Sequence, residues 1–136
     1  MNNVDKIRNA YTEAMKALES GYSHKVKDAI TNLITIFEQE YPERTQNQEV
    51  AFLQLQVAAA SIRYHVFRQD VLSATSSFTL LCEESNKLLK TDILDEHYKE
   101  KTRQLIDETE QVLNAFREKL EHIDNSLTGQ PSPYIK

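Results

Sequence analysis

The chain has few residues that break helices. Only two glycines and three prolines occur among its 136 residues, and Gly129, Pro131 and Pro133 lie within the last eight. The rest of the chain contains just Gly21 and Pro42. A β-rich fold needs many more turn residues, because glycine and proline supply the backbone angles of tight turns. The composition therefore excludes a β-rich fold and argues against an active site built on elaborate loops.

The chain also lacks features of secreted and membrane proteins. Cys82 is the only cysteine, so no internal disulfide can form. No apolar run approaches the roughly 18 residues of a membrane span, and the first residues lack the basic and apolar regions of a secretory signal. We expect a cytoplasmic protein with no membrane partner. Cys82 itself suits a small buried hydrophobe, because no histidine lies within a helical turn to activate it.

The negative charge is concentrated in one part of the sequence. The net charge is −5, and residues 92–124 hold ten acidic against five basic residues, so this segment carries the whole excess. An acidic surface repels the phosphate groups of nucleic acids and of anionic lipids. We therefore expect no nucleic-acid partner.

Apolar residues at alternating spacings of three and four run through the middle of the chain. Such spacing keeps one stripe of side chains on one side of a helix. It predicts a helical segment over about residues 46–89, with a continuous helix as the preferred interpretation. A break near Gln69 stays open, because Asp70 is a good residue to cap a new helix. The members of this main stripe are Val50, Leu53, Val57, Ala60, Tyr64, Phe67, Val71, Ala74, Phe78, Leu81, Ser85 and Leu88.

An earlier helical segment is predicted over about residues 3–41. Its apolar stripe changes phase at Gly21, which indicates either a kink or a break between two helices. Pro42 ends the segment, because proline disfavours helical geometry at the residue before it. Thr45 and Gln48 have the spacing of a capping box, which predicts that the next helix begins there.

A third helical segment is predicted over about residues 93–127, with Asp92 as its N-cap. We expect residues 1–127 to form a single helical-bundle domain and residues 128–136 to form a short flexible tail.

The expected fold class is all-α. Because the three segments have similar lengths, the preferred architecture is an elongated antiparallel bundle of three long helical segments, with the first kinked or broken near Gly21. The alternative is two helical hairpins followed by one long C-terminal helix. A faint repeat with a shift of 45 residues bears on this choice. Two amphipathic helices also align by chance, but a true duplication predicts breaks near both Gly21 and Gln69.

Motifs for cofactors and metals are missing. There is no glycine-rich phosphate loop and no zinc cluster, and none of the four histidines has the preceding glutamate that a di-iron helix needs. We expect no cofactor, no metal and no enzymatic activity. The nearest approach to a polar site is His65 between Arg63 and Arg68, a group that would suit an anion or a carboxylate.

A second apolar stripe lies beside the main one, which indicates that the segment 46–89 is buried on more than one side. In a three-segment bundle this surplus would cover a homodimer interface, whereas in the hairpin alternative it would be the core of the central helices. Tyr22, Phe37 and Tyr98 are further candidate contacts, because aromatic residues are enriched at strong interfaces; core packing is the alternative for Phe37 and Tyr98. The second stripe consists of Phe52, Leu55, Ala59, Ile62 and Val66.

These observations favour a non-enzymatic cytoplasmic module for protein–protein interaction, such as an adaptor, a small chaperone, an immunity protein or a regulatory protein. Long apolar stripes, an acidic third segment and the lack of catalytic motifs all support this interpretation. The expected partner is another protein, or a second copy of the chain in a homodimer.

The alternative function is enzymatic. The third segment contains the run Arg117-Glu118-Lys119-Leu120-Glu121-His122. Its Arg-x-x-x-x-His spacing resembles the motif of HEPN-type helical ribonucleases. The resemblance implies that Arg117 would stabilise the charge of an RNA phosphate and that His122 would move a proton during cleavage. It covers these six residues only, and the position after the arginine, usually polar in that family, is Glu118.

Overall fold

A computed structural model of the chain describes residues 3–40 and 47–128. These residues form five helices and no strand, which confirms the all-α prediction. No helix among them is long and apolar enough to cross a membrane. The five helices are α1 (Asn3–Ser20), α2 (Ser23–Glu40), α3 (Gln48–Phe67), α4 (Val71–Leu89) and α5 (Glu96–Thr128).

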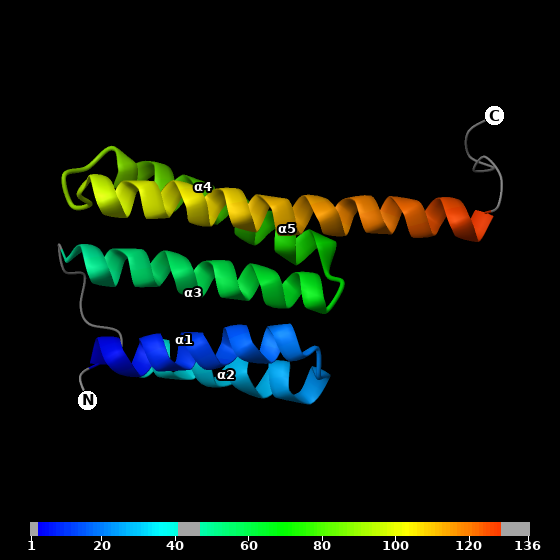
Figure 1. Cartoon of the computed structure of the whole chain (residues 1–136), viewed down its shortest axis with the longest axis horizontal. Coiled ribbons are helices and arrows are strands. Elements are labelled where there is room, and N and C mark those ends of the chain that lie inside the picture. Colours follow the sequence, from blue (N-terminus) through cyan, green and yellow to red (C-terminus); the bar gives the residue numbers. More distant parts are fainter. Residues whose placement is uncertain (1–2, 41–46, 129–136) are drawn as a thin grey trace.

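The helices form two hairpins and a long final helix. α1 packs on α2, α3 packs on α4, and α5 packs on both helices of the second hairpin. Figure 1 shows α3 in the middle, with α1 and α2 on one side of it and α4 and α5 on the other. The preferred three-segment bundle, with one continuous helix over 46–89, is therefore not what is observed. The hairpin alternative describes the arrangement.

The second hairpin turns at three residues. Gln69 has a φ of 63°, the left-handed conformation that ends many helices. Its amide donates to the Val66 carbonyl, and the Asp70 amide donates to the His65 carbonyl, so two terminal carbonyls of α3 are satisfied. The Asp70 carboxylate then accepts from the Ser73 amide at 3.1 Å and caps α4. Asp70 thus belongs to the end of one helix and the start of the next.

The first hairpin turns at Gly21, where the phase shift predicted a kink or a break. Gly21 has a φ of 74°, and its amide donates to the Ala17 carbonyl at 3.3 Å. Glycine takes this conformation without the steric cost that a β-carbon brings. Breaks are therefore present near both Gly21 and Gln69, as a true duplication predicts.

The other helix starts differ from the sequence-based expectations. α3 has Asn47 as its N-cap, with the Asn47 side chain accepting from the Glu49 amide at 2.8 Å. Thr45 and Pro42 lie outside the described residues. α5 begins after Asp95 rather than Asp92, because the Asp95 carboxylate accepts from the Tyr98 amide at 2.9 Å. The predicted tail also lies outside the described residues, apart from Thr128, which ends α5.

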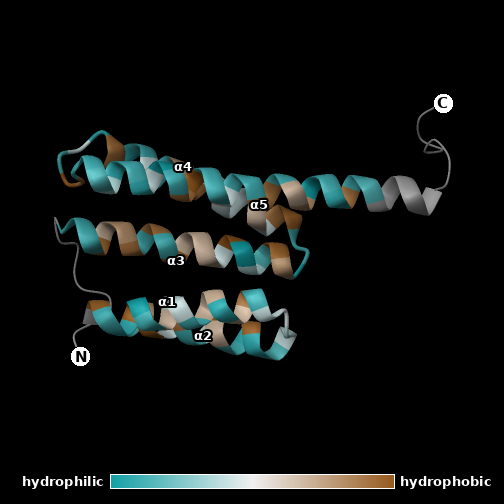
Figure 2. Cartoon of the chain, in the orientation of Figure 1, coloured by the Kyte–Doolittle hydropathy of each residue, from teal (hydrophilic) through white to brown (hydrophobic). Residues whose placement is uncertain are grey.

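Two of the three apolar clusters in the described core share α3, and the third lies between α4 and α5 around Leu113. Leu53, Val57 and Ala60 face the first hairpin, where Ile7 and Leu33 are among their neighbours. On the opposite side of the same helix, a second set is buried with Leu81 of α4, and this set is Leu55, Ala59 and Ile62. Figure 2 shows the resulting contrast in hydropathy, with apolar residues spread along α3 while α5 is mostly hydrophilic. Within α3, the main stripe and the middle of the second stripe are therefore the two buried sides of the helix, and the main stripe continues on α4 from Val71.

One buried hydroxyl has no partner among the described residues. Ser85 interrupts the main stripe, is fully buried in α4, and its Oγ makes no hydrogen bond. We expect Ser85→Ala to raise the free energy of unfolding by about 1 kcal/mol, because the cost of burying an unpaired hydroxyl is removed. Urea unfolding followed by circular dichroism measures this change.

The matched control is Ser61→Ala, a helical serine whose Oγ donates to the Val57 carbonyl at 3.2 Å. Both substitutions replace a helical serine by alanine and gain the same helix propensity. Because Ser61→Ala also loses a hydrogen bond, its free energy of unfolding should rise clearly less than that of Ser85→Ala. Equal changes in the two variants, or a loss of stability in Ser85→Ala, would contradict the assignment of an unpaired hydroxyl.

The left-handed conformation of Gln69 predicts how stability changes when this residue is replaced by glycine. Gln69→Gly should raise the free energy of unfolding by about 0.5 kcal/mol, because relief of the left-handed strain exceeds the extra backbone entropy of glycine. Gln54→Gly, in the exposed middle of α3, should lower it by about 1 kcal/mol. The change to glycine is thus expected to raise the free energy of unfolding at residue 69 and to lower it at residue 54. Thermal and urea unfolding would show a loss in both variants if residue 69 were helical in solution.

Candidate functional site

A groove runs across α3 between α1 and α5. Because α3 lies between these two helices, side chains from three separate parts of the sequence meet there. The groove has a volume of about 230 Å³. We call it the inner groove, and it is lined by Arg8, Tyr11, Thr12, Glu49, Phe52, Leu53, Gln56, Tyr98 and Lys101.

The centre of the inner groove is an aromatic pair beneath a cation. The Phe52 ring meets the Tyr98 ring edge to face, with 5.6 Å between centroids. Lys101 Nζ lies 5.3 Å from the Tyr98 centroid and 5.8 Å from the Phe52 centroid. Such distances permit attraction between the ammonium group and the faces of both rings. Both aromatic side chains are half-buried and Lys101 is exposed, so the site is open to a partner.

Two polar side chains fix the two helices that carry the aromatic pair. Gln48, at the start of α3, donates from Nε2 to the Asp95 carboxylate at 3.2 Å and accepts from the Asp95 amide at 2.9 Å. The same carboxylate caps α5 through the Tyr98 amide. These hydrogen bonds, the one from the Tyr98 amide first, hold the pKa of Asp95 below its usual range. The link sets the register of Tyr98 against Phe52.

A phenol, Tyr11, lies in the inner groove, and Arg63 acts on it from outside the groove lining. Burial raises the pKa of Tyr11; Arg63 acts in the opposite direction and Glu108 in the same direction. The Tyr11 hydroxyl therefore stays protonated at neutral pH and can donate a hydrogen bond. Arg63 belongs to the same side of α3 as Phe52 and Gln56, because these residues recur at helical spacing.

The cations around the inner groove differ in their partners. Arg8 lies 3.9 Å from the Glu49 carboxylate and donates to Asp5 at 3.4 Å. Within residues 3–40 and 47–128, neither Lys101 nor Arg63 forms an ion pair with a carboxylate. Lys101 thus gives the inner groove a positive charge that no carboxylate among the described residues pairs with.

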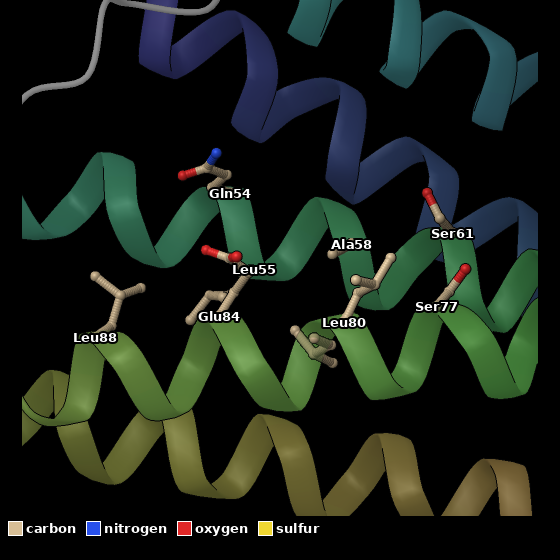
Figure 3. A pocket seen from close by; sticks show the side chains of 9 residues that line it. Gln54, Leu55, Ala58, Ser61, Ser77, Leu80, Glu84 and Leu88 are labelled. Carbon is tan, nitrogen blue, oxygen red and sulfur yellow. The ribbon is translucent and has the colours of Figure 1, made fainter.

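A second groove lies between α3 and α4. Its volume is about 350 Å³, and Figure 3 shows the side chains that line it. Leu80 of α4 borders it and is 61% exposed. The other lining residues, which we group as the outer groove with Leu80, are Gln54, Leu55, Ala58, Ser61, Ser77, Leu81, Glu84 and Leu88.

The residues predicted from the sequence as a binding site are distributed over several places. Phe52 lies in the inner groove. Leu55, Ala59 and Ile62 are buried inside the chain, as the hairpin alternative predicts for this stripe. Val66 is half-buried against the cluster around Leu113.

Tyr22 is 59% exposed in the turn between α1 and α2, where Lys25 Nζ lies 5.0 Å from its ring centroid. The structure does not place it in either groove.

The residues predicted for catalysis or anion binding do not form a common site either. Arg117 donates to the Thr75 hydroxyl of α4 at 3.0 Å, while His122 is exposed farther along α5. Arg68, considered for an anion, instead donates to the Asp70 carboxylate at 2.8 Å. Burial and then the neighbouring Arg68 charge lower the pKa of His65.

The described residues include neither an activated cysteine nor a group of side chains placed to hold a metal ion. Burial raises the pKa of the Cys82 thiol, with Glu110 acting in the same direction, so the thiol is protonated at neutral pH. Among residues 3–40 and 47–128, no group of three or more histidine, cysteine or acidic side chains is placed to hold a metal ion.

Comparison with known proteins yields no relative: no family model, no curated protein and no solved structure matches this chain. The geometry of the two grooves is therefore the basis for a functional proposal.

The hydrogen bonds between Gln48 and Asp95 predict how substitutions of Asp95 change stability. Asp95→Ala should destabilise the protein, because the cap of α5 and the bond to Gln48 are both lost. Asp95→Asn keeps a side-chain oxygen that can accept from the Tyr98 amide, so it should lose less stability than Asp95→Ala. Unfolding in urea at pH 7 measures both changes.

The pH dependence supplies the control for this expectation. Because the folded state lowers the pKa of Asp95, its stabilising effect is full above the unfolded-state value and is lost as pH falls through the folded-state value. The difference in stability between the wild type and Asp95→Asn should therefore shrink on acidification. A difference that does not change with pH would contradict the role of the charged carboxylate.

Proposed function

We propose that this protein is a non-enzymatic cytoplasmic interaction module that binds a segment of another protein in the inner groove. The observation that carries the proposal is the Phe52–Tyr98 pair beneath Lys101. Aromatic residues and exposed cations on a pre-formed surface are typical of sites where a few side chains supply most of the binding energy. An adaptor, a small chaperone, an immunity protein and a regulatory protein all act through such a surface.

The arrangement of the helices supports a partner-binding role. Stacked helical hairpins bring one helix of each hairpin to a common surface, and helical repeat proteins bind partners on such surfaces. Here α1 and α3 come from successive hairpins, and α5 continues the series. The inner groove lies across all three.

The size of the inner groove favours a side chain over a whole small molecule. Sites for drug-sized ligands begin at about 300 Å³, and the inner groove measures about 230 Å³. A single apolar side chain from a partner fits this space, while the rest of the partner segment would lie across the exposed rims of α1 and α5.

The other sequence-based proposals have less support. A homodimer through the second stripe of α3 would need residues that already pack inside the chain, so a different protein is the partner we propose. For ribonuclease activity, Arg117 and His122 are five residues apart on one helix and point about 140° apart. No contact in the described residues brings them to one site. The cytoplasmic location rests on the single cysteine.

Variants of the inner groove test this proposal. In a pull-down from the native host with quantitative mass spectrometry, Phe52→Ala should reduce capture of the partner by at least about tenfold, because a buried aromatic contact is removed. Thr12→Trp should have the same effect, because a bulky uncharged side chain would fill the groove from the exposed side of α1. Circular dichroism establishes that each variant is folded.

Leu80→Ala is the matched control, because Leu80 is an exposed apolar residue of the outer groove. It should leave capture unchanged. If no captured protein depends on Phe52 or Thr12, or if capture depends on Leu80 instead, the inner groove is not the binding site.

A further inference from the structure

We propose that the inner groove selects an acidic partner segment, in which a carboxylate pairs with Lys101 and a neighbouring apolar side chain packs on Phe52 and Tyr98. This inference rests on the proposed function and names the chemistry of the partner.

The first argument is the position of Lys101. Its ammonium group lies over two rings, at 5.3 and 5.8 Å, and has no carboxylate partner in the described residues. Contact with the rings restricts the side chain before any partner arrives, which reduces the entropy lost on binding. The one carboxylate of the groove lining, Glu49, lies 3.9 Å from Arg8. A carboxylate from a partner is therefore the missing ligand of this cation.

The second argument is that the other charges near the groove act against each other. Arg63 lies outside the groove lining, and its charge and that of Glu108 act on Tyr11 in opposite directions. Arg8 of the lining lies 3.9 Å from the Glu49 carboxylate. Lys101 is therefore the cation at which a partner carboxylate is expected to bind.

Nucleic acid is the other anion that lysine and arginine bind. The chain carries a net charge of −5, and residues 92–124 of the third segment supply the excess. A phosphate backbone bears one charge per nucleotide and is repelled along its whole length, whereas an acidic peptide needs only one or two carboxylates at the groove. An acidic peptide is therefore the partner that the charges favour.

A random peptide library displayed on phage and selected on the immobilised full chain tests the inference. Enriched peptides should combine Asp or Glu with an aromatic or aliphatic residue. The highest-ranking peptide, made with a fluorescent label, should bind at least about tenfold more weakly to Lys101→Glu, because a like charge replaces the complementary one. Its binding should also weaken at high ionic strength.

Lys119→Glu is the matched control. It makes the same change in charge on the same helix, and Lys119 follows Lys101 by 18 residues, or about five full turns. It should bind the peptide like the wild type. Circular dichroism of both variants shows whether they are folded, and Lys101→Gln, which removes the charge without reversing it, should lie between wild type and Lys101→Glu.

Three results would overturn the inference. These are enrichment of peptides without acidic residues or no enrichment at all, equal peptide binding by wild type and Lys101→Glu, and Lys101-dependent binding of a labelled 12-nucleotide single strand in place of the peptide. If Phe52→Ala still abolishes capture of a protein partner, each of these results leaves the proposed function in place and removes only the acidic preference.

Discussion

The structure depends on burial of α3 from two opposite sides. Leu53, Val57 and Ala60 pack on the first hairpin, and Leu55 and Ile62 pack towards α4 and α5. A single helix therefore joins both apolar layers, and neither layer would be complete without it. Burial of apolar area is the largest favourable contribution to folding, so the two faces of this helix hold the first hairpin on one side and α4 and α5 on the other.

Two-sided burial of α3 requires the chain to reverse at Gln69. If α3 continued as one helix through residue 89, the stripe that contains Leu81 would extend past the end of the first hairpin and would not meet α3. The reversal lets Leu81 pack against Ile62. Gln69 takes a left-handed conformation that costs about 1 kcal/mol or more for a residue with a β-carbon. Burial between α3 and α4 offsets this cost many times.

The inner groove is a consequence of the same arrangement. Hairpins stacked on one central helix leave one side of α1, α3 and α5 open, and the Gln48–Asp95 link sets the position of α5 along α3. The aromatic pair under Lys101 therefore joins two helices that are far apart in the sequence. Much of the acidic charge of the chain lies on α5, yet Lys101 of the same helix is directed to the aromatic rings.

The sequence by itself determined the all-α class, a kink or break at Gly21 and two apolar stripes in the segment 46–89, because helical spacing and glycine conformations are local properties. It did not decide the break at Gln69, since the apolar spacing keeps its phase there and glutamine does not mark a left-handed residue. Nor did it bring Phe52 to Lys101. Only tertiary packing decided these points, because the free energy that offsets a strained turn and aligns distant helices comes from contacts between helices.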